Sequence, residues 1–411
     1  MMPFFLLIYR ETVIIDIAVS EKYKIVISCA AGLSSLLAGE IRSLRLPVVS
    51  ETLSGVSTEG TFEDALRLNL HVRTGHRVLF YLNDFRAECP DDLYRGITMI
   101  PWEDYIPADG YLCVSSSVSH ETIRDSRYAN MRCKDAIVDR IRSRRGRRPD
   151  SGPEKEGASV FFYWKRDRCF VYLDTSGDPL ARRGYRKIPL KAPLQETLAA
   201  AIVMTTGWCG GSHFINPMCG SGTLAIEAAL IGLNKAAGLL RDNYAFMHLN
   251  GFDRALWDLM KETARRQSRN EVGGRIVATD TNPEAIAAAK KNAENAGVAD
   301  FIEFKTCDFA ETVVPDGDGV VVLNPEYGER MGAGKDLPAH YRRIGDFLKQ
   351  RCRGYRGYVF TGNPALAKMV GLRTRRRVRF FNGKIECRLL EYELYEGSRK
   401  TGRGIDNVGE K

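Results

Sequence analysis

The sequence predicts an α/β protein: a doubly wound, mostly parallel sheet in the carboxy-terminal half, preceded by a smaller α+β part. From about residue 190, short apolar runs alternate with segments of helical periodicity, the pattern of repeated β-α units. Before that point strands and helices follow one another in mixed order, and residues 146–157 (GRRPDSGPEKEG) form a loop rich in Gly, Pro and charge. A chain of 411 residues is also too long for one ordinary core, which indicates two or three domains.

Short-range patterns place the elements of the amino-terminal part. Residues 23–30 (YKIVISCA) are typical of a strand, and residues 33–44 carry apolar side chains at helical spacing. Two strands at 158–164 and 169–173 are close enough to form a hairpin. The other elements that we expect here are strands at 78–82 and 111–114 and a helix at 133–145 whose last turn is basic.

The carboxy-terminal half continues with alternating elements. In chain order we expect a helix at 194–206, a strand at 213–216, a helix at 223–233, a strand at 275–279, a helix at 283–296, strands at 301–305 and 319–323, a helix at 337–351 and a strand at 357–361. The last two strands, 376–382 and 387–394, are joined at Asn382-Gly383-Lys384, a hairpin signal.

Composition favours a globular protein with a polyanionic partner. The chain is 44% hydrophobic and 27% charged, with a formal net charge of +9. Its arginines cluster in two runs, at 142–148 and 373–379. Such runs favour phosphate contacts, although a solvated charged face is the alternative for either run alone.

Other compositional features argue against a metal site and a membrane. Ten cysteines show no C-x-x-C pair, and six scattered histidines form no zinc pattern, so we expect reduced thiols, no metal and a cytoplasmic protein. The apolar start at 4–8 is interrupted by Arg10, Glu11 and Asp16 too soon for a signal peptide or a membrane span.

A glycine-rich turn lies between the first strand and helix of the carboxy-terminal half. Residues 216–223 read Asn-Pro-Met-Cys-Gly-Ser-Gly-Thr, in which Gly220 and Gly222 would let the backbone approach a ligand at a helix N-terminus. A plain tight turn is the alternative. Asp280 ends the next strand, where a carboxylate can bind ribose hydroxyls, and Asp308 follows the third strand, suitably placed for an adenine amino group.

A second motif follows the fourth strand. Residues 324–330 read Asn-Pro-Glu-Tyr-Gly-Glu-Arg, one residue away from Asn-Pro-Pro-Tyr, the signature of enzymes that methylate exocyclic amino groups. The Asn324 side-chain carbonyl and the Pro325 backbone carbonyl can accept hydrogen bonds from such a group, while Tyr327 stacks on the base. The alternative is an ordinary β-turn after a strand.

With these motifs in place, the chain resembles the THUMP-domain RNA guanine-N2-methyltransferases, in particular those that act on 23S ribosomal RNA. The resemblance covers roughly residues 23–396 and includes MRCKDAIVDRIR (131–142), LDTSGDPLARRGYRK (173–187) and APLQETLAAAIVMTTGW (192–208). It implies a class I methyltransferase domain with a seven-stranded, mostly parallel sheet, and S-adenosylmethionine as cofactor. The implied partner is 23S rRNA or a large-subunit assembly intermediate.

The resemblance also implies a domain plan: an extension at 1–22, a ferredoxin-like module at 23–62, a THUMP domain at 63–175, a methyltransferase domain at 176–398 and a disordered tail at 399–411. Some members of the family fuse a second methyltransferase domain to the first; in this chain we expect the first domain alone.

The family pattern assigns roles to particular residues. Those implied in catalysis are Asn324, Pro325, Glu326 and Tyr327. Those implied in cofactor binding are Asn216, Pro217, Cys219, Gly220, Gly222, Thr223, Asp280, Asp308 and Asn324. Those implied in RNA binding are Arg142, Arg144, Arg145, Arg182, Arg183 and Arg186, the last three with structural salt bridges as an equal alternative.

Two residues depart from the family pattern, which usually has Asp at the position of Asn216 and Pro at that of Glu326. Asn216 keeps an acceptor oxygen without the charge, and Glu326 removes a backbone restraint and adds a carboxylate. Other functions therefore remain open: methylation of tRNA guanine, methylation of DNA amino groups, and RNA binding by a protein that has lost catalysis.

Overall fold

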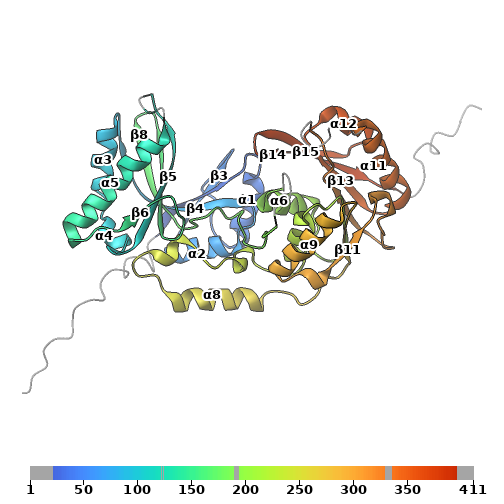
Figure 1. Cartoon of the computed structure of the whole chain (residues 1–411), viewed down its shortest axis with the longest axis horizontal. Coiled ribbons are helices and arrows are strands. Elements are labelled where there is room, and N and C mark those ends of the chain that lie inside the picture. The colour runs from blue at the N-terminus through green and yellow to red at the C-terminus, as the bar shows by residue number, and fades with distance from the viewer. Residues whose placement is uncertain (1–21, 122, 124, 189–193, 329–335, 396–411) are drawn as a thin grey trace, which may run out of the picture. The chain divides into compact units, whose positions relative to one another are not determined.

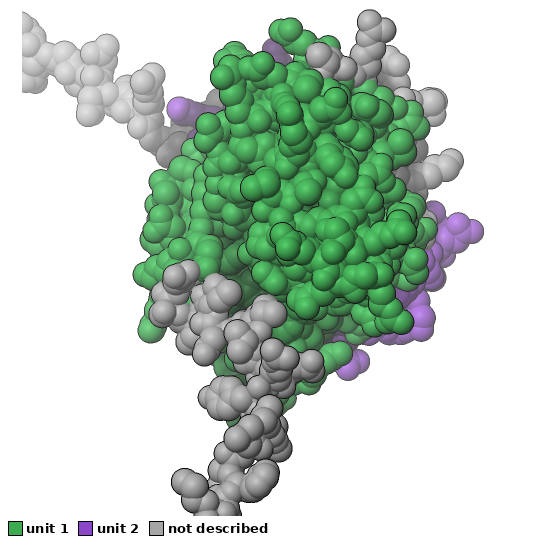
Figure 2. Space-filling view, turned by 90° about the vertical axis from the view of Figure 1, so that its left-hand side faces the viewer, with its two compact units in different colours: residues 1–183, 236–266 green, residues 184–235, 267–411 purple. Residues whose placement is uncertain are grey.

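The computed structural model describes residues 22–121, 123, 125–188, 194–328 and 336–395, in two compact units. The first unit comprises residues 1–183 and 236–266, and the second comprises 184–235 and 267–411 (Figure 2). The expected amino-terminal extension, apart from Lys22, and the expected tail lie outside the described residues, as does Gly332-Ala333-Gly334-Lys335, which lacks the pattern of a triphosphate-binding loop.

The first unit is built on an eight-stranded sheet with the strand order β2-β3-β1-β4-β8-β7-β5-β6 (Figure 1). Its strands are β1 (Tyr23–Cys29), β2 (Ser50–Thr52), β3 (Gly55–Gly60), β4 (Gly75–Arg86), β5 (Tyr111–Ser119), β6 (Asp150–Ser151), β7 (Ala158–Lys165) and β8 (Arg168–Asp174). Its helices are α1 (Ser34–Ser43), α2 (Phe62–His71), α3 (Pro90–Thr98), α4 (Trp102–Tyr105), α5 (Ser126–Arg145) and α8 (Arg254–Arg266), with 3-10 turns η1 (Ala237–Leu240) and η2 (Ala245–His248). The ferredoxin-like and THUMP parts thus share one continuous sheet through the long strand β4.

Local signals explain two helices of this unit. Helix α2 begins with a capping box, in which the Thr61 hydroxyl accepts from the Asp64 N–H and the Asp64 carboxylate accepts from the Thr61 N–H. The basic helix α5 ends at Gly146, whose φ of 69° is the left-handed conformation that glycine supplies at helix ends.

Residues 236–266 group with the first unit, whereas we expected 176–398 to form one domain. The Arg241 guanidinium donates to the carbonyl oxygens of Asp178 and Ser176, both at 3.0 Å. The backbone N–H of Asn250 donates to Tyr105 O at 2.9 Å. These hydrogen bonds tie the segment to the first unit, although the residues before it (184–235) and after it (267–411) belong to the second unit.

The second unit contains a seven-stranded sheet in the order β11-β10-β9-β12-β13-β15-β14. Its strands are β9 (His213–Pro217), β10 (Ile276–Asp280), β11 (Ile302–Thr306), β12 (Gly319–Leu323), β13 (Arg356–Thr361), β14 (Arg376–Asn382) and β15 (Ile385–Glu393). Its helices are α6 (Glu196–Thr206), α7 (Thr223–Gly232), α9 (Pro283–Ala296), α11 (Leu337–Arg351) and α12 (Pro364–Met369), with 3-10 turns η3 (Ala299–Phe301) and η4 (Phe309–Glu311). In this sheet the neighbouring strands β11, β10, β9, β12 and β13 are parallel to one another. Strand β15 is antiparallel to β13, and β14 is antiparallel to β15. This arrangement confirms the predicted class I methyltransferase fold.

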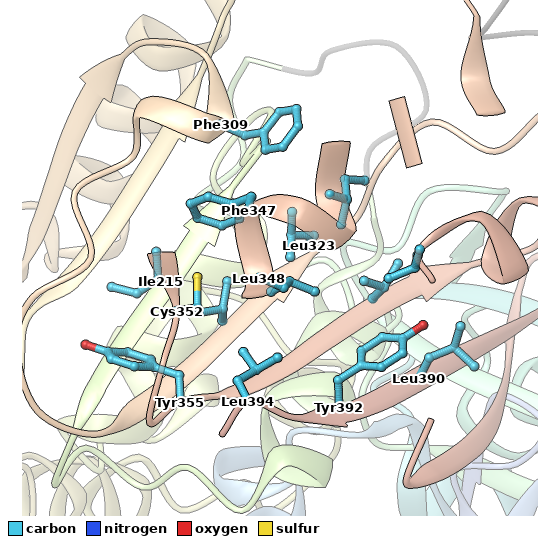
Figure 3. Packing of buried hydrophobic residues seen from close by; sticks show 14 of the residues in the cluster. Ile215, Phe309, Leu323, Phe347, Leu348, Cys352, Tyr355, Leu390, Tyr392 and Leu394 are labelled. Atoms are coloured by element: carbon cyan, nitrogen blue, oxygen red, sulfur yellow. The ribbon is translucent and has the colours of Figure 1, made fainter. Parts of the chain in front are cut away.

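Helix α11 anchors one face of this sheet. Its buried side chains Tyr341, Ile344, Phe347 and Leu348 pack in a cluster with Ile215 of β9 and residues of β12, β13 and β15 (Figure 3). The neighbouring residue Phe214 faces the other way and contacts Trp208, with ring centroids 5.2 Å apart. Both faces of β9 are therefore covered, as expected of a central parallel strand.

Candidate active site

The carboxyl ends of the parallel strands bring the predicted motifs to one edge of the sheet. In the parallel register of β9 and β10, Asn216 pairs with Ala278 and Pro217 with Thr279. Strand β12 lies on the other side of β9 and ends immediately before Asn324. Ligands of doubly wound sheets bind at this edge, so the sequence motifs converge where the fold places a binding site.

The glycine-rich turn is held in a shape that requires glycine. Gly220 and Gly222 have φ values of 54° and 82°, in the left-handed region. A Cβ atom on Gly222 would come within 2.9 Å of the Ala289 side chain on α9. The turn therefore lies against α9 and leads directly into the start of α7.

Asp280 at the end of β10 fixes this turn. Its Oδ2 accepts a hydrogen bond from the Gly220 N–H at 2.9 Å, and its Oδ1 accepts from the Asn282 N–H at 3.0 Å. A carboxylate that is already oriented by two backbone N–H groups can accept a third donor with little reorganisation. The predicted role of Asp280 toward ribose hydroxyls is compatible with this position.

Asn292, which sequence reasoning missed, and Arg186, which was predicted to bind RNA, support the same turn. The side chain of Asn292, fully buried on α9, donates to Ser221 O at 3.2 Å and accepts from the Lys187 N–H at 3.2 Å. Thr223, the first residue of α7, accepts from the Arg186 guanidinium at 3.1 Å. Asn292 lies in an Ala-rich helix, and nothing in its local sequence marks it as a partner of the turn.

Asn216 combines a structural bond with an open acceptor. It is 0% exposed, and its Nδ2 donates to Val322 O of β12 at 2.9 Å. Its Oδ1 is buried and accepts no hydrogen bond from the described residues. This oxygen is therefore available to a donor of a bound ligand, such as the amino group of an amino acid.

The remaining residues of the turn are buried. Pro217 and Cys219 are both shielded from solvent, and burial raises the pKa of the Cys219 thiol. The thiol is therefore protonated, and we assign it a packing role beside the turn.

Asp308 is also placed as expected, but it already has a cationic partner. It caps the 3-10 turn η4, where its Oδ1 accepts from the Ala310 N–H at 2.9 Å. The Arg343 guanidinium donates to the same oxygen at 2.8 Å. An adenine amino group at this position would have to share the carboxylate with Arg343.

The Asn-Pro-Glu-Tyr loop is held at its centre by residues distant in sequence. The buried Tyr341 hydroxyl of α11 donates to Glu326 O at 3.3 Å and lies 2.9 Å from the Thr361 hydroxyl. This contact restrains the backbone at the position where the family pattern has proline. Tyr341 and Thr361 were not predicted, because each lies in a different element and carries no motif.

Tyr327 is anchored by its hydroxyl. That oxygen accepts from Asn382 Nδ2 at 3.0 Å and lies 3.6 Å from Cys387 Sγ, and burial raises the pKa of Tyr327 to about 12. A Cβ atom on Gly362 would lie 2.9 Å from the Tyr327 ring, so glycine is needed for the ring to fit. A half-buried ring fixed at its far end can offer a face to a base.

Asn324 has the same unusual feature as Asn216. Its Oδ1 is buried and receives no hydrogen bond from the described residues. Pro325 beside it is buried, and Glu326 and Tyr327 are half-buried. The same short loop therefore carries an unused acceptor and an aromatic ring, two groups that a planar ligand with an exocyclic NH2 could use.

The six predicted RNA-binding arginines fall into two groups. Arg142, Arg144, Arg145 and Arg182 are exposed. Arg183 is 1% exposed and donates to Arg73 O at 2.8 Å, and Arg186 donates to Leu194 O at 2.5 Å and pairs with Glu196 at 3.4 Å. These contacts favour the structural alternative for Arg183 and Arg186, because a guanidinium engaged inside the protein is not available to phosphate.

The described part of the chain has neither a metal-binding cluster nor a membrane-spanning helix. Within it no group of three or more His, Cys, Asp or Glu side chains is arranged to hold a metal ion. No helix among the described residues is both long and apolar enough to cross a membrane.

The fold defines a class I methyltransferase domain preceded by a second α+β unit. Three family models match the chain: an RlmL ferredoxin-like domain at 24–79, a THUMP domain at 89–174 and an RMKL-like methyltransferase domain at 183–391. The chain belongs to the RMKL-like methyltransferase family.

Named relatives agree with this assignment. The chain is 40% identical over 377 residues to a ribosomal RNA large subunit methyltransferase K/L of Syntrophotalea carbinolica, covering 89% of this chain and 53% of the relative. It is 36% identical to a putative RNA methyltransferase of Synechocystis, covering 89% and 95% respectively. The chain thus spans about half the length of the K/L relative and nearly the whole length of the Synechocystis relative.

Solved structures show the same architecture. A putative methyltransferase in complex with SAH has a TM-score of 0.83 and 27% identity, and the match covers 92% of this chain and all of that one. A predicted N6-adenine-specific DNA methylase from Listeria monocytogenes has a TM-score of 0.81 and 29% identity, covering 91% and 97%.

Proposed function

We propose that this chain transfers the methyl group of S-adenosylmethionine to the exocyclic N2 of a guanine in 23S rRNA. The observation that carries the proposal is the buried Oδ1 of Asn324, which has no partner among the described residues and belongs to the same loop as Tyr327. Methyltransferase family membership and relatives named as large-subunit rRNA methyltransferases support the reaction type and the RNA.

The glycine-rich edge provides the cofactor site. S-adenosylmethionine, when bound, supplies a methyl group on a sulfonium sulfur that leaves as a neutral thioether. Asn216 Oδ1 would accept from its amino group, the Gly220–Gly222 turn would face its methionine part, and Asp280 would accept from its ribose. The structural neighbour in complex with SAH supports this choice of cofactor.

The Asn-Pro-Glu-Tyr loop provides the base site. The guanine N2 lone pair is delocalised into the ring, so the enzyme has to accept hydrogen bonds from the NH2 group and hold N2 in line with the methyl carbon. Asn324 Oδ1 and Pro325 O are the acceptors in this proposal. As the N2–methyl bond forms, N2 becomes positively charged, and these oxygens stabilise that charge before a proton leaves to solvent.

The base has to leave its stack to reach this loop. Flipping costs a few kcal/mol, which stacking on Tyr327 and phosphate contacts elsewhere can offset. The exposed residues Arg142, Arg144 and Arg145 on the last turn of α5, together with Arg182, are candidates for those contacts. Arg144 lies 3.9 Å from the Glu103 carboxylate, a distance that leaves its guanidinium accessible to phosphate.

Glu326 is compatible with this mechanism. Its backbone carbonyl is held by the Tyr341 hydroxyl at 3.3 Å, a restraint that acts at the position where the family pattern has a proline. We infer that the loop keeps its shape through Tyr341, so that the chain does not depend on proline there.

The test is methyl transfer from labelled S-adenosylmethionine to total RNA that lacks large-subunit guanine-N2 methylation, with the natural protein and with Glu326→Pro. Label in 23S rRNA with the natural protein supports the proposal. Label in tRNA would identify the tRNA enzyme instead. Label only with Glu326→Pro would indicate a protein that has lost catalysis and retains RNA binding.

A further inference from the structure

A basic hollow lies in the second unit beside the Asn-Pro-Glu-Tyr loop. It has a volume of about 730 Å³ and is formed by α12, the segment after it and the β14–β15 hairpin. Four of its lining residues are cationic: Lys368, Arg373, Arg377 and Arg388. The only carboxylate among the lining residues is Glu386.

Most of these charges are not neutralised. Arg388 pairs with Glu386 at 3.4 Å, and the adjacent Arg379 shares the same carboxylate at 3.5 Å. Among the described residues no carboxylate lies within ion-pair distance of Lys368, Arg373 or Arg377, although the neighbouring Arg375 pairs with Glu393 at 2.6 Å. All three side chains are exposed. The hollow therefore carries excess positive charge inside a concave surface, where a field is concentrated.

The register of the hairpin places arginines on the same side of the sheet. Arg379 is directly opposite Arg388, and Arg377 is opposite Leu390, which also lines the hollow. Because side chains alternate between faces, Arg377, Arg379 and Arg388 lie on one face of the hairpin. Like charges directly opposite one another destabilise a sheet, and Glu386, which pairs with both Arg379 and Arg388, offsets this repulsion. Arg377 is the arginine of this face that has no carboxylate partner among the described residues.

The hollow adjoins the proposed base site through shared residues. Gly362 lines the hollow, and a Cβ atom there would come within 2.9 Å of the Tyr327 ring. Thr361 also lines it, and its hydroxyl lies 2.9 Å from the Tyr341 hydroxyl that holds the loop. The hollow therefore lies directly beside the ring that the proposed base site uses.

We propose that this hollow binds the sugar-phosphate backbone next to the target guanosine. The inference rests on the proposed function, because it takes RNA as the substrate. Arginine recognises phosphate oxygens with two parallel hydrogen bonds, and three cations without carboxylate partners can hold more than one phosphate. The second unit would thereby bind RNA through its own residues, in addition to those of the first unit. Its contacts to the phosphates would hold the flipped nucleotide in position by its sugar-phosphate backbone.

The experiment compares two triple variants that each remove three positive charges. The test variant is Lys368→Gln, Arg373→Gln and Arg377→Gln. The control is Arg351→Gln, Arg353→Gln and Arg356→Gln. All three are exposed: Arg351 ends α11, Arg353 follows it, and Arg356 begins β13 at the opposite end of that strand from Thr361. The affinity of each variant for RNA is measured by titration with a fluorescent single-stranded oligouridylate over a range of salt concentrations. The affinity of each variant for the cofactor is measured in a separate titration with S-adenosylmethionine.

We expect the test variant to bind the oligouridylate at least about tenfold more weakly than the control. The slope of log affinity against log salt should fall by about 0.7 for each phosphate that the variant no longer binds, or roughly 2 for three phosphates. Cofactor affinity and the melting temperature should match those of the control, which shows that the variant is folded. Arg377→Lys, which keeps the charge, should recover most of the affinity that Arg377→Gln removes.

Equal affinity and equal salt slope in the two triple variants would overturn the inference. Methyl transfer separates this failure from failure of the proposed function. If the natural protein methylates rRNA and the test variant does so with the same KM for RNA as the control, the hollow is not a backbone site. If the natural protein transfers no methyl group to any RNA, the proposed function itself fails, and the binding titration still decides whether the hollow holds a polynucleotide.

Discussion

Asn69 in the first unit and the two motif asparagines in the second unit differ in how their buried side-chain oxygens are bonded. In the first unit, Asn69 Nδ2 donates to Ala65 O and to the Thr175 hydroxyl, both at 2.8 Å, and Asn69 Oδ1 accepts from the Ser176 hydroxyl at 2.6 Å. In the second unit, Asn216 and Asn324 each keep a buried Oδ1 without a partner in the described chain.

The difference separates structural polar groups from those reserved for a ligand. An unpaired buried acceptor costs about 1–3 kcal/mol, so a fold tolerates it where binding later satisfies it. Asn69 contributes stability alone, whereas Asn216 and Asn324 sit at the edge where the cofactor and the base are expected. Substitutions at these positions should therefore have different consequences for stability, cofactor affinity and methyl transfer.

Asn324→Ala should have the largest effect. Loss of the acceptor should lower kcat for methyl transfer by about 10²–10³-fold, because it acts on charge that develops at N2. Cofactor affinity, measured by isothermal titration, should stay nearly constant. Loss of cofactor binding in this variant would contradict the assigned role.

Asp280→Ala should act on the cofactor instead. It removes the acceptor that holds the Gly220 N–H at 2.9 Å, along with the predicted ribose contact. Hydrogen bonds to a charged group are worth about 1.5–3 kcal/mol, so the dissociation constant for S-adenosylmethionine should rise about 10–150-fold. If transfer at saturating cofactor fell as far as in Asn324→Ala, the division between the two sites would be wrong.

Asn69→Ala should change stability and leave chemistry alone. Removing a fully bonded buried amide should lower the free energy of unfolding by about 1–3 kcal/mol, seen as a lower melting temperature of the first unit. Methyl transfer well below that temperature should keep its kcat. A large loss of kcat with an unchanged melting temperature would remove the contrast with Asn324.

Asn216→Asp should sharpen the comparison within the cofactor site. Aspartate restores the family charge but cannot donate to Val322 O, so the protein without cofactor should be destabilised by about 1–3 kcal/mol. Saturating S-adenosylmethionine should recover most of this loss, because its amino group would pair with the carboxylate. Thermal unfolding with and without cofactor measures both effects. An equal loss of stability in both conditions would show that the cofactor amino group does not bind beside residue 216.

The smallest effect concerns pH. Burial raises the pKa of Tyr327 to about 12, from an ordinary value near 10. The folded state thus favours the neutral phenol, and the resulting stability is complete below pH 10 and is lost between about pH 10 and 12. Tyr327→Phe should reduce this alkaline dependence of the melting temperature, to which other buried tyrosines such as Tyr244 and Tyr392 also contribute; an unchanged profile would mean that Tyr327 has no part in it.

Sequence patterns located much of the second unit. The helix Pro283–Ala296 and the strands Gly319–Leu323 and Arg376–Asn382 have the predicted bounds. The helix begins with an Asn-Pro cap and ends at a glycine, and the central strand is continuously apolar, so local rules suffice. The family and the fold expected from the two motifs are confirmed.

Other features depend on contacts that no local pattern contains. Strand β3 reads Gly-Val-Ser-Thr-Glu-Gly, without the alternation that marks a strand, and is fixed by pairing with β1. Residues 236–266 join the first unit through long-range hydrogen bonds. At the site, Asn216 and Asn324 followed from motifs, whereas Tyr341 and Asn382 act through the folded chain from elements distant in sequence.

The most direct test of the account is nucleoside analysis of 23S rRNA after incubation with S-adenosylmethionine and either the natural protein or Asn324→Ala. The account predicts N2-methylguanosine with the natural protein and about 10²–10³-fold less of it with the variant at equal cofactor occupancy. A methyl group on any other atom, or equal product from both proteins, would contradict the role of the unpaired asparagine oxygen.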